Sequence, residues 1–192
     1  MMDDQQRADL RQTLVEKAYQ MGFEYEKAYG GCGQCTLLTL QDLFGRRNDD
    51  VFTALTGMAG GAGRLCDVGC GAYMGGVAFL SALRGRSIDN IKDPTDIRSQ
   101  THSLVQKLHA KFVQEYGTVI CRDMHMRLFG RYFYMADPEE RKKFNDAGAH
   151  TTVCTSVVGK ACRWVVEIII DEGLLPEGEL ARAALVSVQL PS

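Results

Sequence analysis

The sequence predicts an all-α fold, a compact single-domain bundle of about six to eight helices. Apolar residues recur every three to four positions along most of the chain, and helix-starting and helix-ending residues bracket these stretches. No alternating strand pattern and no βαβ order is present. The length of 192 residues favours one core. We expect a helical, cysteine-rich domain over residues 1–174, followed over residues 175–192 by a short helix and an extended tail.

The first part of the chain predicts three helices. Residues 9–29 carry apolar side chains at helical spacing and are followed by the helix-breaking Gly30. A second helix is predicted over residues 34–44, and Gly45 ends it. A short helix near residues 51–55 follows.

A glycine-rich loop over residues 57–63 leads into an unusual stretch, residues 66–83, which is apolar almost all round and is predicted to be helical. It contains several glycines, and each glycine inside a helix costs about 1 kcal/mol relative to alanine. Gly71 and Gly75 are four residues apart, so both face the same neighbour. That neighbour is either another helix or a cofactor, which makes both glycines candidate cofactor-binding positions.

Two Asp-Pro pairs mark helix starts in the second part of the chain, because aspartate is a favoured cap and proline a favoured first helical residue. They are Asp93-Pro94 and Asp137-Pro138. The predicted helices of this part cover residues 94–116, 121–129, a stretch from residue 138, 151–172 and 177–186.

The composition excludes several classes of protein. Hydrophobic residues make up 45% and charged residues 24% of the chain, and the formal net charge is −2, which does not suggest a nucleic-acid partner. No apolar stretch is long enough to span a membrane. The N-terminus is polar and lacks an apolar signal core, so we expect a cytoplasmic protein in a reducing compartment.

The seven cysteines are the strongest functional signal. Their number is odd and too small for a disulfide scaffold, so we expect metal binding, redox chemistry or burial. Cys32 and Cys35 form a Cys-x-x-Cys motif at a predicted helix start, where the helix dipole lowers a thiol pKa. Cys66 and Cys70 are four residues apart and are expected to share a helix face.

Cys121 and Cys154 also lie near predicted helix starts, whereas Cys162 lies on an apolar face and is expected in the core. Helix starts can converge in a bundle, and their free N–H groups offset the negative charge of a thiolate-bound cluster. His125, four residues after Cys121, could face the same centre, although a satisfied or exposed histidine is the commoner role. The candidate metal ligands are Cys32, Cys35, Cys66, Cys70, Cys121 and Cys154.

These motifs resemble those of the redox-active family named for its cysteine pattern, C_GCAxxG_C_C. The matching pieces are Cys32-Gly-Gln-Cys-Thr-Leu-Leu, the glycine-rich loop to Gly63, Cys70-Gly-Ala-Tyr-Met-Gly75, Gly117-Thr-Val-Ile-Cys121 and Cys154-Thr-Ser-Val-Val, which span roughly residues 30–170. The resemblance implies that Cys32, Cys70, Cys121 and Cys154 are the family cysteines. Gly71 stands between Cys70 and the alanine, so the second motif departs from a literal GCAxxG.

The resemblance further implies a helical redox domain. A related domain occurs in split-Soret cytochromes, which are dimers that carry haem and an iron–sulfur centre, so a homodimer is plausible by analogy. This chain has no Cys-x-x-Cys-His motif, and covalent c-type haem is therefore not expected.

Three functional hypotheses remain open from the sequence. The first is a protein that binds an iron–sulfur cluster for electron transfer or redox sensing, with a redox partner protein that the sequence does not identify. The second is a dithiol/disulfide oxidoreductase or thiol sensor that uses Cys32 and Cys35. The third is a helical interaction module without redox activity. No acid–base pair is recognisable, so no catalytic residue and no enzymatic reaction is assigned.

Overall fold

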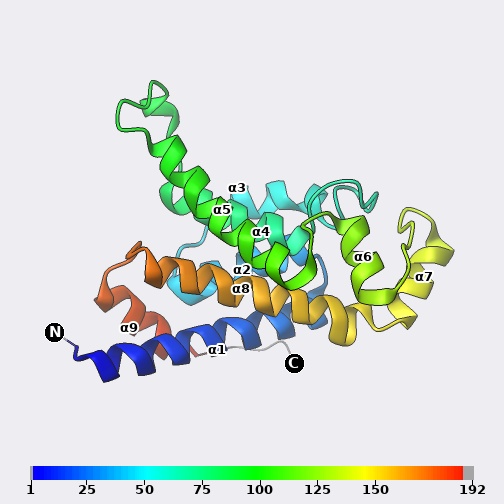
Figure 1. The fold of residues 1–192 in the computed structure, drawn as a ribbon, viewed down its shortest axis with the longest axis horizontal. Coiled ribbons are helices and arrows are strands. Elements are labelled where there is room, and N and C mark those ends of the chain that lie inside the picture. Colours follow the sequence, from blue (N-terminus) through cyan, green and yellow to red (C-terminus); the bar gives the residue numbers. More distant parts are fainter. Residues whose placement is uncertain (1, 188–192) are drawn as a thin grey trace.

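Helices α1 (Asp4–Tyr29) and α8 (Cys154–Asp171) pack side by side along the long axis of the protein (Figure 1). The computed structural model describes residues 2–187. Small residues allow the two backbones to approach closely, since a Cβ atom added to Gly22 would lie 3.3 Å from the Cα of Gly159. The pair forms the base on which several of the other helices pack.

The remaining α-helices in chain order are α2 (Cys32–Phe44), α3 (Asp49–Ala54), α4 (Gly71–Arg84), α5 (Ile97–Tyr116), α6 (Cys121–Phe129), α7 (Pro138–Asp146) and α9 (Glu177–Leu185). A π-helical turn over Ala149–Val153 leads into α8. Within residues 2–187 there are nine α-helices and no strand beyond one isolated bridge between Gly69 and Ile120. The all-α prediction is confirmed, with one helix more than the upper end of the expected number.

The buried apolar residues form a large and a small core. The large core lies among α1, α2, α4, α5 and α8 and includes Leu37, Phe112 and Ile169. The small core lies at the end of the molecule where α6 and α7 are found (Figure 1). Its buried members are Cys66, Cys121, Phe133, Met135, Phe144 and Ala149. Two cysteines of the chain therefore belong to the small core, which bears directly on the functional site.

The C-terminal helix α9 packs against α1 and α2 and contributes Leu180 and Ala183 to the large core. The predicted boundary at residue 174 falls between α8 and α9 and stays a prediction. The predicted extended tail lies, from residue 188 onward, outside the described residues. None of the described helices combines the length and the apolar character that crossing a membrane requires.

The helix predicted over residues 66–83 begins later, at Gly71. Residues 66–70 are not helical, because their backbone is hydrogen-bonded to the segment before α6. Cys66 has a φ of +64°, which a right-handed helix does not allow. The expectation that Cys66 and Cys70 share a helix face is therefore wrong.

The helix predicted from Asp93 also begins later, at Ile97. Asp96 has a φ of +53° and cannot belong to the helix. Asp93 still serves as the cap from a distance, since its carboxylate accepts hydrogen bonds from the N–H groups of Ile97 at 2.7 Å and Arg98 at 2.9 Å. At Asp137 the predicted start is confirmed: its carboxylate accepts from the N–H groups of Glu139 and Glu140.

Candidate metal centre

Cys32 is the first residue of α2 and follows Gly31, which has a φ of +89°. Its thiol faces that of Cys70, the residue immediately before α4, and interaction between the two thiols raises the pKa of Cys32. The two helices can approach this closely because position 71 has no side chain: a Cβ atom on Gly71 would lie 2.2 Å from the sulfur of Cys32. On Gly75, a Cβ atom would lie 2.4 Å from the carbonyl oxygen of Gly33. The neighbour that these two glycines accommodate is thus α2.

A short backbone ladder brings two more cysteines to the same place. The N–H of Cys70 donates to the carbonyl of Val119 at 2.7 Å, and the N–H of Cys121 donates to the carbonyl of Val68 at 2.9 Å. The N–H of Arg122 donates to the carbonyl of Cys66 at 3.0 Å. This pairing places Cys66 and Cys70 beside Cys121, the first residue of α6.

Cys154 is the first residue of α8 and follows the π-helical turn. Such turns are rare and recur at functional sites. The turn carries His150, whose Nδ1 atom lies 3.0 Å from an Oε atom of Glu26 on α1. Glu26 is fully buried, and its other carboxylate oxygen has no hydrogen-bond partner among the described residues.

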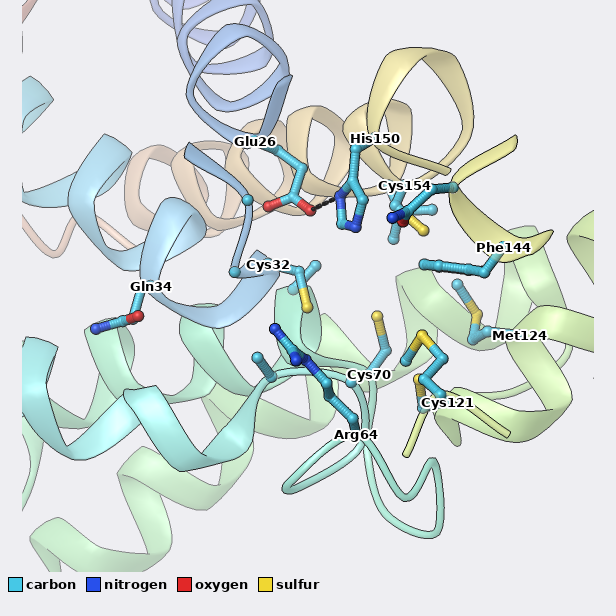
Figure 2. Close-up of a pocket in the computed structure, with 18 of the residues that line it drawn as sticks. Glu26, Cys32, Gln34, Arg64, Cys70, Cys121, Met124, Phe144, His150 and Cys154 are labelled. Atoms are coloured by element: carbon cyan, nitrogen blue, oxygen red, sulfur yellow. Dashed lines mark hydrogen bonds and ion pairs between the residues drawn. The ribbon is translucent and has the colours of Figure 1, made fainter. Parts of the chain in front are cut away.

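These elements surround one cavity of about 870 Å³. Figure 2 shows Cys32, Cys70, Cys121 and Cys154 around the cavity, with the Glu26–His150 pair beside Cys154. Cys32 and Cys70 come from the large core, whereas Cys121 and Cys154 pack with the small core. The cavity therefore lies where the two cores meet, and each of the four cysteines stands at the start of a different helix.

Among the described residues, only one trio of ligand-type side chains has its ligand atoms within 4.8 Å of one another, namely Cys66, Cys121 and His125. The Nε2 atom of His125 lies 3.8 Å from the sulfur of Cys121. His125 is 3% exposed and Cys66 is fully buried. No three of the four cavity cysteines are as close together as this trio.

Burial and interactions between neighbouring thiols shift the pKa values of these cysteines. Burial raises the pKa of Cys35, and the hydrogen bond with Cys70 followed by burial raises the pKa of Cys32. The pKa of Cys121 is raised by its hydrogen bond with Cys66 and by burial. The same hydrogen bond lowers the pKa of Cys66. The expected lowering of the thiol pKa values in the Cys-x-x-Cys motif is therefore wrong, because the pKa values of both Cys32 and Cys35 are raised.

Two further cysteines point away from the cavity. The thiol of Cys35 faces the backbone carbonyls of Gly30 at 3.0 Å and Tyr25 at 3.5 Å, and Cys35 is not part of the cavity wall. Cys162 is fully buried between α8 and α1, and its thiol lies 3.8 Å from the carbonyl of Thr36. Cys162 thus lies in the core, as the sequence predicts.

Three cations line the cavity: Lys27, Arg64 and Arg141. Within the described part of the chain, none of them forms an ion pair with a carboxylate. The carboxyl group of Glu26 is the only acidic side chain that the described wall contributes. Cationic side chains and helix N-termini together favour an anionic occupant.

The sequence did not single out Glu26, Arg64, Arg141 or His150. Glu26 lies near the end of an amphipathic helix whose polar residues look solvated, and His150 has no partner at metal-ligand spacing in the sequence. The contact between them joins residues 124 positions apart, which no local pattern reveals. For His125 there is a local signal, its spacing of four residues from Cys121 along α6.

Comparison with known proteins identifies the family of the chain. A family model described as "Putative redox-active protein (C_GCAxxG_C_C)" matches residues 31–168, which include all four cavity cysteines. No curated protein and no solved structure gave a match. Because the matched region covers well over half of the sequence, the chain belongs to the C_GCAxxG_C_C family of redox-active proteins.

Proposed function

We propose that this protein binds an iron–sulfur cluster through Cys32, Cys70, Cys121 and Cys154 and uses it for electron transfer or redox sensing. The observation that carries the proposal is the convergence of these four cysteines, each from the start of a different helix, on one cavity. Thiolates are the ligands that iron–sulfur clusters require. The family described above, whose model covers all four residues, supports a redox role.

The spacing of the sulfurs favours a cluster over a single ion. Four thiolates around one tetrahedral zinc ion, each about 2.3 Å from the metal, lie about 3.8 Å from one another. No three of the four cavity cysteines lie within 4.8 Å of one another. A cluster with several iron atoms separates its ligands further than one ion does, and the cavity of about 870 Å³ leaves room for it.

The cavity also fits an anionic group. The helices α2, α4 and α6 each present an N-terminus, and the positive end of a helix dipole favours thiolate and sulfide charge. Lys27, Arg64 and Arg141 add positive charge. The glycine at position 71 leaves the sulfur of Cys32 free to face the cavity. A bound cluster would supply one-electron transfer, and the chain would hold it, offset its charge and limit the access of water.

The alternative dithiol function of Cys32 and Cys35 has less support. The thiol of Cys32 lies with that of Cys70 at the cavity, whereas the thiol of Cys35 faces backbone carbonyls. Burial raises the pKa of Cys35, which disfavours the thiolate that attacks disulfides. A homodimer and a separate redox partner protein stay predictions, which light scattering and affinity measurements on the iron-loaded protein would test.

Single substitutions test the ligand set. The full chain would be purified without oxygen, reconstituted with iron and sulfide, and assayed for both elements. We expect Cys→Ser at position 32, 70, 121 or 154 to remove most of the iron. Cys162→Ser, which removes a buried thiol outside the cavity, should keep it. Full iron and sulfide content in all four variants would contradict the proposal.

A further inference from the structure

Cys66, Cys121 and His125 form a compact group at one side of the cavity, whose wall includes Cys121 and His125 but not Cys66. Two of the three residues, Cys66 and His125, are not used by the proposed cluster. We propose that this trio is a separate site for one divalent metal ion of the zinc type, with Cys121 shared between the ion and the cavity.

The spacing of the trio matches a single ion. With a metal–sulfur distance of about 2.3 Å and a metal–nitrogen distance of about 2.05 Å, a tetrahedral ion places a nitrogen and a sulfur ligand about 3.6 Å apart. The Nε2 atom of His125 and the sulfur of Cys121 are 3.8 Å apart in the structure. Cys66 completes a trio whose ligand atoms all lie within 4.8 Å. Binding therefore requires small movements of side chains rather than a rearrangement of the backbone.

The histidine is placed as a ligand rather than as a hydrogen-bonded core residue. His125 is 3% exposed and lies among the rings of Phe129, Phe133 and Phe144. Its Nδ1 atom has no hydrogen-bond partner within residues 2–187, and the thiol of Cys121 is the only hydrogen-bond partner of Nε2 among these residues.

Cys66 is held in place by a strained loop. Its φ of +64° lies in a region that residues with a Cβ atom seldom occupy. The strain is maintained because the N–H of Cys66 donates to the carbonyl of Gly60 at 2.9 Å, while its own carbonyl accepts from the N–H of Arg122 at 3.0 Å. These bonds lock the residue against the start of α6, where Cys121 lies. Observed backbone strain of this kind is frequent at binding sites.

The ligand set selects the ion. Two thiolates and one imidazole favour zinc over the hard cations magnesium and calcium, which take oxygen ligands. Three protein ligands leave the fourth tetrahedral position open to water or another donor. Because Cys121 lies on the cavity wall as well, its thiolate has a lone pair on each side and can bridge the ion and a cluster. Binding releases the protons of both thiols.

Cobalt(II) is a suitable probe, because its bonds to thiolates absorb light whereas those of zinc do not. The background is the full chain with Cys32→Ser, Cys70→Ser and Cys154→Ser, which removes the other cavity thiolates and leaves the trio intact. We expect one cobalt ion per chain with thiolate-to-cobalt charge-transfer bands, displaced by zinc. Adding His125→Gln should weaken binding by more than about 100-fold, because even outer-shell partners of metal ligands are worth about 10–100-fold. Adding His102→Gln, a substitution of the same type at an exposed site, should change nothing.

A second comparison keeps the test decisive if the triple variant folds poorly, which circular dichroism would reveal. In the otherwise unmodified chain, Cys66→Ser and His125→Gln should lose bound zinc yet keep the reconstituted iron and sulfide. Unchanged cobalt or zinc affinity after His125→Gln or Cys66→Ser would overturn the proposed ion site. If the four cavity variants lose only iron, or if the native chain contains no iron, the result concerns the cluster and not the ion site. Cobalt binding then decides whether the ion site exists.

Discussion

Replacing Gly71 by alanine should displace the sulfur of Cys32 without unfolding the protein. The added Cβ atom would lie 2.2 Å from this sulfur, whereas ordinary contact begins at about 3.4 Å, so the sulfur must move by roughly 1.2 Å. Metal–ligand distances tolerate only about 0.2 Å. We therefore expect Gly71→Ala to lose most of the bound iron. Overpacking of this kind also costs about 1–3 kcal/mol of unfolding free energy.

Gly22→Ala is the matched control. Its Cβ atom would lie 2.7 Å from the sulfur of Cys162, so it also presses on a buried cysteine, but on one outside the cavity. Urea unfolding of the metal-free proteins should show losses of similar size, about 1–3 kcal/mol, in both variants. Iron and sulfide per folded chain should fall only in Gly71→Ala. Equal iron content in the two variants would refute the assignment of Cys32 as a ligand that needs the space at Gly71.

Three further predictions concern stability. Burial lowers the pKa of His125 from 6.5 to about 4, so between these pH values the unfolded chain binds a proton that the folded chain does not. As the pH falls from about 6.5 to 4, the metal-free protein should therefore lose roughly 3 kcal/mol of unfolding free energy relative to His125→Gln. Urea unfolding across this range measures the difference, and a constant difference would exclude a buried neutral imidazole. Asp137→Ala removes the cap of α7, the helix whose Phe144 stacks on His125, and should lower the unfolding free energy by about 0.5–2 kcal/mol in the same assay. No loss would mean that the cap is not formed in solution. Gly178→Ala, whose Cβ atom would meet no neighbour within 4 Å in α9, should stabilise by about 0.4–1 kcal/mol, and a loss would show that the helix is not formed there.

Helical periodicity and end signals predicted most of the fold, because they are local. Gly45, Gly117 and Gly130 end α2, α5 and α6 in left-handed conformation, as their positions in the sequence indicate. The prediction of a helix over residues 66–70 is wrong for a reason that is not local. This apolar, glycine-rich stretch suits a helix by itself, but its backbone is hydrogen-bonded to the segment before α6, some 50 residues away.

For the candidate site, too, the sequence predicted the local features but not their arrangement in space. The helix starts at Cys32, Cys121 and Cys154 are local features, and the sequence located them within a few residues. Their convergence depends on how the helices pack, so neither the cavity nor its separation from Cys35 could be derived from the spacing of cysteines. The Glu26–His150 contact likewise arises only when α1 and the π-helical turn before α8 come together.

The spectrum of the native chain, isolated without oxygen, tests the central claim most directly. We predict a coloured protein that contains iron and sulfide, whose visible absorption bleaches and whose electron paramagnetic resonance changes when dithionite reduces it. A colourless protein that holds no iron, and that stays colourless after reconstitution with iron and sulfide, would contradict the account.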